Sequence, residues 1–255
     1  MSKLNTNSNA YIIIYSAILV VIVAFLLAFV FKALKPMQDA NVALDIKKQI
    51  LYSLNIRDLD GAEAEAKYAE VVKEEKEADG QKIYVCSVDG KEVCVFSMKG
   101  MGLWGGISGY VAIHDQDGPT VYGAYFNHEG ETAGLGAEIK DSQAWQEKFI
   151  GKKVFKGSDY EHIALSVVKN VDDVETQVDC VTGATLTSNG VDAMLKDGLK
   201  PLMQEIQNAV QDCCKEIAGE CSHDNTQDCC KETDGECSHQ ATKECCKDST
   251  TVKAE

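Results

Sequence analysis

Residues 82–125 read KIYVCSVDGKEVCVFSMKGMGLWGGISGYVAIHDQDGPTVYGAY. Short runs rich in β-branched and aromatic residues alternate here with glycine-containing turns, as in the successive strands of a sheet. Two turns carry Asp-Gly pairs, Asp89-Gly90 and Asp117-Gly118, which are typical of hairpins. The pattern predicts antiparallel strands around 83–85, 93–96, 110–113 and 120–122.

Helical patterns flank this stretch. Apolar residues between 42 and 56 recur close to helical spacing and predict an amphipathic helix, whereas the charge-rich residues 63–79 predict a surface helix or a connection. Further helices are expected at 142–149 and from about 189 to 209. Strands with a few helices, and no repeating strand-helix-strand order, indicate an α+β fold with a mostly antiparallel sheet and flanking helices.

Residues 11–31, YIIIYSAILVVIVAFLLAFVF, contain no charged side chain. About 20 apolar residues, each rising about 1.5 Å along a helix, cross a hydrocarbon core of about 30 Å. The alternative is a signal peptide, whose apolar core is shorter, roughly 7 to 15 residues, and which ends in a small-residue cleavage site. The segment is longer and leads into Lys32 and Lys35, so we predict a single transmembrane helix in contact with membrane lipid.

The formal net charge of −15 argues against a nucleic-acid partner, because binding a phosphate backbone relies on clustered Lys and Arg. An anionic ligand would have to be held locally.

More positive charges follow the apolar segment than precede it, and a literal count would place the C-terminal side in the cytoplasm. That count is a weak guide, since long domains are translocated largely regardless of charge.

Beyond residue 211 the composition changes to a cysteine-rich repeat that holds eight of the eleven cysteines. Because the repeat has almost no large apolar residues, we expect it to be disordered.

The chain is thus expected to divide into five regions. They are an N-terminal segment (1–10), the transmembrane helix (11–31), a juxtamembrane helical region (32–80), a globular domain (81–210) and the tail (211–255).

Residues 179–191, DCVTGATLTSNGV, are the most informative for ligand binding. Small residues at Gly183 and Ala184 let the backbone approach a bulky ligand, and the hydroxyls around them can bind phosphate oxygens. Ser188 or Asn189 can cap the following helix, whose N-terminal amides favour an anion. Taken alone, these residues fit a capped strand-to-helix turn without a ligand equally well.

The same residues resemble D-x-x-[ST]-G-A-T, the motif at which a transferase attaches FMN through its phosphate to the final threonine. Residues 128–136, HEGETAGLG, resemble an ETxGLG segment, and residues 100–110, GMGLWGGISGY, resemble a G-x-G-L-W run. Together and in this order, over about residues 10 to 210, they resemble the C subunit of the Na+-translocating NADH:quinone reductase. Ala133 departs from the family, where proline is common, and the tail has no counterpart.

The resemblance implies an electron-relay subunit of a ubiquinone or menaquinone reductase, with covalent FMN on Thr185 and no catalytic residue of its own. It implies the other membrane subunits and a flavin transferase as partners. It places residues 1–10 in the bacterial cytoplasm and the FMN-binding domain, 81–210, on the periplasmic side of the cytoplasmic membrane. The residues implied to bind the flavin are Leu103, Trp104, Glu131, Thr132, Leu135, Gly136, Asp179, Thr182, Gly183, Ala184, Thr185 and Thr187. Lys169 is a candidate positive charge near the flavin.

Several of these residues also have a structural explanation. Leu103 and Trp104 can fill the core, and Glu131 and Thr132 can cap a turn. Lys169 can be an ordinary solvated lysine. His128 is expected to be a surface or supporting histidine and not an acid-base catalyst.

Two other functions stay open. The flavin-carrying G subunit of an Rnf-type ferredoxin:NAD+ oxidoreductase resembles the chain in its anchor and threonine motif, although the segment 44–93 favours the quinone reductase. The tail offers thiolate and imidazole groups suited to zinc or copper(I), although its vicinal cysteines lack the Cys-x2-Cys spacing of ordered zinc sites. The chain would then be a membrane-tethered metal-binding or thiol module. Its candidate ligands are Cys213, Cys214, Cys221 and His223.

Overall fold

The structure is a computed structural model that describes residues 8–78, 80–115, 118–157 and 160–207. The predictions for the tail, both its disorder and its metal ligands, lie outside the described residues. The chain divides into two compact units, Met1–Lys48 and Gln49–Glu255. Each unit is described by itself.

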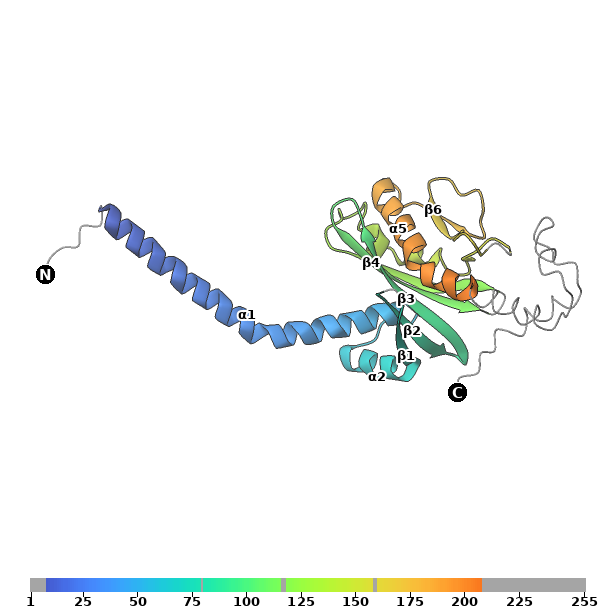
Figure 1. Cartoon of the computed structure of the whole chain (residues 1–255), viewed down its shortest axis with the longest axis horizontal. Coiled ribbons are helices and arrows are strands. Elements are labelled where there is room, and N and C mark those ends of the chain that lie inside the picture. The colour runs from blue at the N-terminus through green and yellow to red at the C-terminus, as the bar shows by residue number, and fades with distance from the viewer. Residues whose placement is uncertain (1–7, 79, 116–117, 158–159, 208–255) are drawn as a thin grey trace, which may run out of the picture. The chain divides into compact units, whose positions relative to one another are not determined.

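The first unit is most of one long helix, α1 (Asn9–Ser53, 45 residues). Its most apolar 18-residue window has a mean hydropathy of 3.1 and none of it is buried, so the helix is long and apolar enough to cross a membrane. The sequence predicted two helices here, at 11–31 and 42–56, and that division is wrong. Pro36 lies inside the helix. A proline removes one backbone hydrogen bond and bends a helix without having to end it, which accounts for the bend of α1 in Figure 1.

The second unit is built on a five-stranded antiparallel sheet in the order β1-β2-β3-β4-β5, which confirms the predicted sheet. Asp89 and Gly90 both have positive φ, at 51° and 78°, and form the tight turn between β2 and β3. The strands are β1 (Val72–Ala78), β2 (Gln81–Val88), β3 (Lys91–Met101), β4 (Gly106–Asp115) and β5 (Pro119–His128).

Strand β1 was not predicted, since its sequence VKEEKEA falls in the charge-rich range expected to be a helix or a connection. It is one of the two edge strands of the sheet, and five of its seven residues are exposed. Charged side chains on an exposed edge discourage pairing with another chain. The charged composition of β1 therefore reflects its position at the edge. A strand of this kind shows no alternation of apolar and polar residues, so that pattern does not predict it.

Both faces of the sheet are covered. One face carries the larger core, in which Phe96, Val111 and Phe126 pack against α5 and the segment around Trp145. The other face carries a smaller core of Val93, Val95 and neighbours with Ile50, near the end of α1, and Leu54, which directly follows the helix. A bulge opposite Ala112 and Ile113 adds one residue to β5 and keeps its apolar residues on the buried faces.

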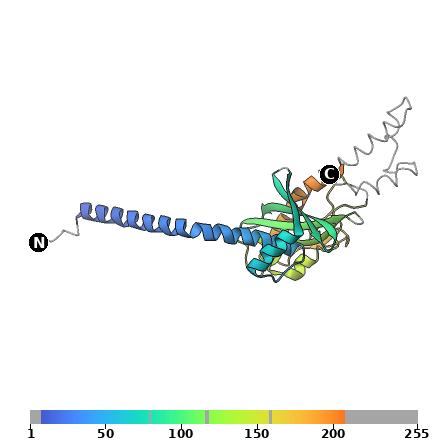
Figure 2. The same cartoon turned by 90° about the horizontal axis from the view of Figure 1, so that it is seen from below.

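The remaining elements surround this sheet (Figures 1 and 2). They are α2 (Gly61–Val71), α3 (Glu138–Asp141), α4 (Gln143–Glu147), the parallel pair β6 (Ser166–Val168) and β7 (Gln177–Asp179), and α5 (Thr185–Gly198). The helix predicted at 142–149 corresponds to α4, which Ser142 caps by accepting a 3.3 Å hydrogen bond from Trp145 N–H. The helix predicted from about 189 to 209 begins four residues earlier, at Thr185, and packs on β3. It ends at Gly198, and residues 200–207 are helical again, while the predicted end at 209 lies outside the described residues.

Candidate functional site

The three sequence motifs, up to about 80 residues apart in the chain, meet at one place in the second unit. Gly190 of α5 lies so close to the Met101 carbonyl that a Cβ at this position would overlap its oxygen. Gly183, with φ of 79°, lies against Leu135, whose Cδ2 atom would be 2.9 Å from a Cβ at Gly183. Helix α5 and the turn before it therefore contact both of the other motifs.

Glu131 is buried at the centre of this junction, with 8% of its surface exposed. Its carboxylate accepts a 2.9 Å hydrogen bond from the Trp104 backbone N–H and a 2.7 Å bond from the Thr187 hydroxyl. Burial raises the pKa of the Glu131 carboxyl. The bonds from Trp104, Thr187, Leu103 and Gly105 outweigh that effect and hold its pKa below the usual range. Glu131 is thus an ionised carboxylate whose two oxygens are occupied inside the protein.

Thr185 is the first residue of α5 and is exposed, whereas Thr187 is buried at 1% exposure. The residue before the helix is Ala184, which provides no side-chain cap. The predicted cap by Ser188 or Asn189 is therefore wrong, because both residues lie inside the helix. The Ser188 hydroxyl instead accepts a 3.1 Å hydrogen bond from Val181 N–H and holds the turn that precedes α5.

Large apolar side chains are exposed around this junction. Trp104 is 71% exposed and Leu103 48%, so neither fills the core, and that alternative is wrong. Leu135 is 43% exposed and Leu186, beside Thr185, is 60% exposed. Exposed apolar side chains gathered at one place mark a surface that binds another apolar group. Leu186 was not singled out in the sequence, although it lies inside the threonine motif.

The first residue of the threonine motif, Asp179, forms an ion pair with Lys148 at 2.8 Å. Trp145 Nε1 donates a 2.8 Å hydrogen bond to the Asp179 carbonyl, so the end of β7 is attached to α4. Both charged side chains are about half exposed, and such pairs contribute only about 0 to 1 kcal/mol to stability. Sequence reasoning missed Lys148, because 31 residues separate it from Asp179.

The other predicted residues fall into two groups. Thr132, Thr182 and Lys169 are exposed, and Lys169 directly follows β6, whose last carbonyl accepts a hydrogen bond from Cys180 N–H. Gly136 and Ala184 are buried. His128 Nδ1 accepts a 3.2 Å hydrogen bond from Glu131 N–H, so this histidine supports the turn that carries the carboxylate.

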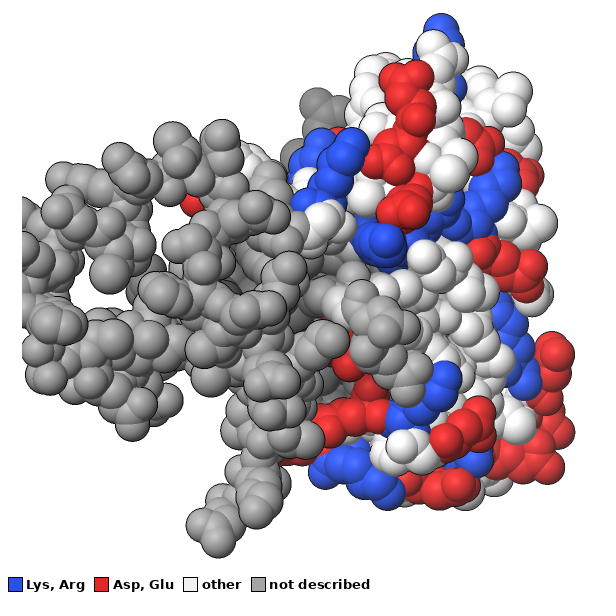
Figure 3. Space-filling view, turned by 90° about the vertical axis from the view of Figure 1, so that its right-hand side faces the viewer, with Lys and Arg blue, Asp and Glu red and all other residues white. Residues whose placement is uncertain are grey.

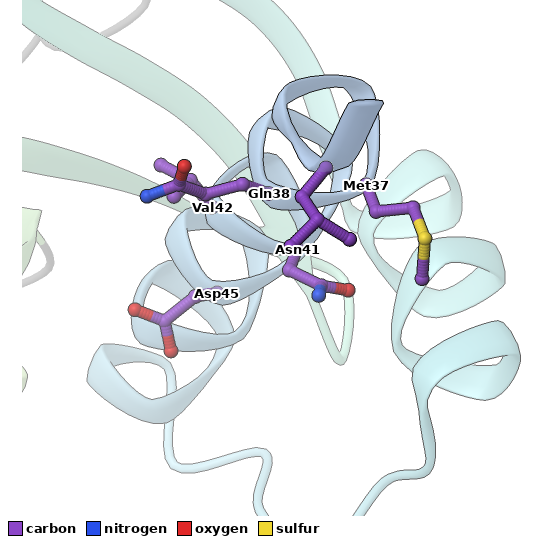
Figure 4. Close-up of a pocket in the computed structure, with 6 residues that line it drawn as sticks. Met37, Gln38, Asn41, Val42 and Asp45 are labelled. Atoms are coloured by element: carbon purple, nitrogen blue, oxygen red, sulfur yellow. The ribbon is translucent and has the colours of Figure 1, made fainter. Parts of the chain in front are cut away.

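Other features of the described surface are mixed charge on one face and a hollow on α1. On the face shown in Figure 3, Lys and Arg side chains alternate with Asp and Glu side chains. Within the described residues there is no group of three or more potential metal ligands. Among the described residues of the first unit, a hollow on α1 is lined by this one helix alone (Figure 4). Its lining residues are Leu34, Met37, Gln38, Asn41, Val42 and Asp45.

Comparison with known proteins agrees with the motifs. Residues 102–200 match the FMN-binding domain family. The chain is 38% identical over 160 residues to the C subunit of the Na(+)-translocating NADH-quinone reductase of Neisseria meningitidis, covering 60% of this chain and 56% of that protein. It is 43% identical over 134 residues to the same subunit from Haemophilus ducreyi, covering 51% and 46%. The chain thus spans about half the length of the curated relatives it matches.

The chain is also similar to solved structures. The crystal structure of the same reductase subunit from Parabacteroides distasonis is 34% identical, with a TM-score of 0.57, over 65% of this chain and 93% of that one. Shewanella oneidensis NqrC is 21% identical, with a TM-score of 0.53, over 64% and 97%, and its likeness concerns the fold alone.

Proposed function

Because the chain belongs to the family of C subunits of the Na(+)-translocating NADH-quinone reductases, we propose that it is the FMN-carrying electron-transfer subunit of such a reductase. The observation that carries the proposal is the junction of the three motifs. They form one surface on which Thr185 and several apolar side chains are exposed together. The complex would supply NADH and quinone sites, and this chain would relay electrons between other membrane subunits.

The flavin is proposed to be covalent, as a phosphoester on Thr185. Of the three threonines in the motif, Thr187 is disfavoured as the acceptor because it is buried and its hydroxyl donates to Glu131. Thr182 and Thr185 are both exposed, but only Thr185 lies at the N-terminus of α5, where the helix amides favour a negatively charged phosphate. A covalent tether also lets an acidic protein retain an anionic nucleotide without a basic pocket.

The residues present fit an FMN group in a second respect. Leu103, Trp104, Leu135 and Leu186 expose apolar surface next to the proposed acceptor, and a flat aromatic ring would cover such surface. When bound, the flavin supplies the electron transfer. Thr185 would hold the phosphate, and the exposed apolar side chains would contact the ring and shield it from water. A relay of this kind needs no acid or base from the chain, and the buried carboxylate at the junction, Glu131, is already hydrogen-bonded.

Helix α1 is proposed to anchor the chain in the bacterial cytoplasmic membrane in a single pass. The N-terminus would lie in the cytoplasm and the FMN-binding domain on the periplasmic side, as in the family that the sequence resembles. A flavin transferase would act on the domain there. This orientation opposes the count of positive charges, which is a weak guide for a long translocated domain.

The test is to express the full chain with a flavin transferase and to examine it on a denaturing gel under ultraviolet light, where only covalent flavin gives a fluorescent band. We expect a band from the wild type and from Thr182→Ala, and none from Thr185→Ala. Mass spectrometry of the peptide then locates the flavin. A band that persists in Thr185→Ala and disappears in Thr182→Ala would move the attachment to Thr182.

A further inference from the structure

Glu131 connects the segment 102–105 with helix α5 through both of its carboxylate oxygens. Oε1 accepts the Trp104 N–H at 2.9 Å, and Oε2 accepts the Thr187 hydroxyl at 2.7 Å. Hydrogen bonds to an ionised acceptor are roughly twice as strong as those between neutral groups, and burial limits their screening by water. The side chain of one motif therefore joins the other two.

Two glycines make room for this carboxylate. A Cβ at Gly102 would overlap Oε1 of Glu131, and a Cβ at Gly136 would overlap Oε2 and lie 2.6 Å from Thr187 Oγ1. Neither glycine has a positive φ, so neither is required by the backbone conformation. Their lack of a side chain is explained by the position of Glu131, which indicates a junction built around the carboxylate.

The two groups that bind Glu131, the Trp104 N–H and the Thr187 hydroxyl, belong to segments that carry exposed residues of the site. Trp104 donates its backbone N–H to Glu131, while 71% of the residue is open to solvent. Thr187 lies two residues after Thr185, and side chains two apart on a helix do not face each other. Thus Thr187 points inward to Glu131 while Thr185 stays at the surface.

We propose that Glu131 is a positioning residue of the flavin site. Its carboxylate fixes the 102–105 backbone against the first turn of α5, so that the Trp104 ring and the Thr185 hydroxyl are presented in one arrangement. This role rests on the proposed function. It differs from the direct contact to the flavin ring or ribityl chain that the family resemblance implied for Glu131, because both carboxylate oxygens are used inside the protein.

The first measurement uses the full chain in detergent without flavin. Hydrogen exchange, followed by mass spectrometry at single-residue resolution, reports the opening of the Trp104 amide. In Glu131→Gln the acceptor loses its charge, and we expect this amide to exchange about tenfold faster. Glu129→Gln changes an exposed carboxylate two residues away and is the matched control, with unchanged exchange expected. Equal rates in Glu131→Gln and the wild type would overturn the proposal.

The second measurement follows covalent flavin incorporation by the transferase, together with the visible circular dichroism of the product. We expect Glu131→Gln and Thr187→Val to incorporate flavin roughly 10- to 100-fold more slowly and to show an altered spectrum, because small displacements of reacting groups have effects of that order. Thr187→Ser keeps the hydroxyl and is expected to behave like the wild type. If Glu131→Gln fails to fold, the Thr187→Val and Thr187→Ser pair decides the question.

The outcomes separate the two proposals. A wild-type protein that acquires no covalent flavin refutes the proposed function, while hydrogen exchange at Trp104 still reports on Glu131. Wild-type incorporation rates and spectra in both Glu131→Gln and Thr187→Val refute the positioning role alone.

Discussion

Trp104 and Trp145 occupy opposite environments in the FMN-binding domain. Trp104 is 71% exposed, whereas Trp145 is 4% exposed and packs against Phe126 and Phe149 with ring centroids 5.6 and 5.2 Å away. Trp145 also donates its indole N–H to the Asp179 carbonyl. The first side chain is available to a ligand, and the second is part of the core.

Replacing each tryptophan with alanine tests this difference. We expect Trp104→Ala to change the free energy of unfolding by no more than about 0.5 kcal/mol and to shift the absorbance of the bound flavin. Trp145→Ala is expected to destabilise the domain by about 3 to 5 kcal/mol. Urea denaturation and visible spectroscopy provide the two measurements. A large loss of stability in Trp104→Ala with an unchanged flavin spectrum would contradict the exposed position.

The lowered pKa of Glu131 predicts how stability depends on pH. A carboxyl whose folded pKa lies below its unfolded value, about 4.3, stabilises the fold above that value. The contribution is lost as the pH falls through the folded pKa. We therefore expect the difference in unfolding free energy between wild type and Glu131→Gln to be constant at neutral pH and to shrink below about pH 4.3. Denaturation curves at a series of pH values check this, and a difference independent of pH would show that the carboxylate is not the titrating group.

Among the elements, α5 carries the proposed acceptor and also packs closely on another motif. Its Gly190 contacts the Met101 carbonyl, which belongs to the backbone and cannot rotate away. In a free helix, alanine is more favourable than glycine by about 1 kcal/mol. Steric overlap with a backbone atom outweighs that preference.

We expect Gly190→Ala to destabilise the domain by about 1 to 3 kcal/mol despite its better helix propensity. Gly130→Ala is the matched control, because a Cβ at Gly130 meets no atom within 4 Å. Its effect should stay within about 0.5 kcal/mol. Thermal unfolding of the two variants makes the comparison, and a stabilised Gly190→Ala would show that α5 lies further from the 101–102 backbone.

At the scale of the whole molecule, the boundary between the two units lies inside α1. Residues from Gln49 onward belong to the second unit, and Ile50, Leu51 and Leu54 are at most 1% exposed there. The end of α1 is therefore a part of the globular core, whereas no residue of its most apolar window is buried.

A chain that begins at residue 49 is accordingly expected to fold and to stay in solution without detergent. A chain that begins at residue 58 loses three buried apolar side chains and is expected to unfold at much lower urea concentration, since removing one such side chain already costs about 2 to 5 kcal/mol. Circular dichroism and gel filtration of the two truncated chains measure the difference. Equal stability would place the domain boundary after Leu54.

The local features were predictable from the sequence because their causes are local. β-Branched runs and the Asp89-Gly90 turn predicted strands β2 to β5, and the uninterrupted apolar run predicted the helical segment 11–31 but not the full length of α1. The order of the motifs, by resemblance, led to the family that the comparisons bear out. Two local predictions failed because contacts with other parts of the fold determined the structure. Edge strand β1 has no apolar alternation, and Ser188 bonds Val181 instead of capping α5.

Only the tertiary structure decided which side chains meet at the site. Glu131 reaches Trp104 and Thr187 across 27 and 56 residues, and Lys148 pairs with Asp179 across 31. Periodicity, turns and motifs describe neighbours along the chain, whereas these contacts depend on how the strands and α5 pack in space. For the same reason, the sequence could name Trp104 and Leu103 but could not place them on the surface. Their exposure follows from the packing of 102–105 around the Glu131 carboxylate.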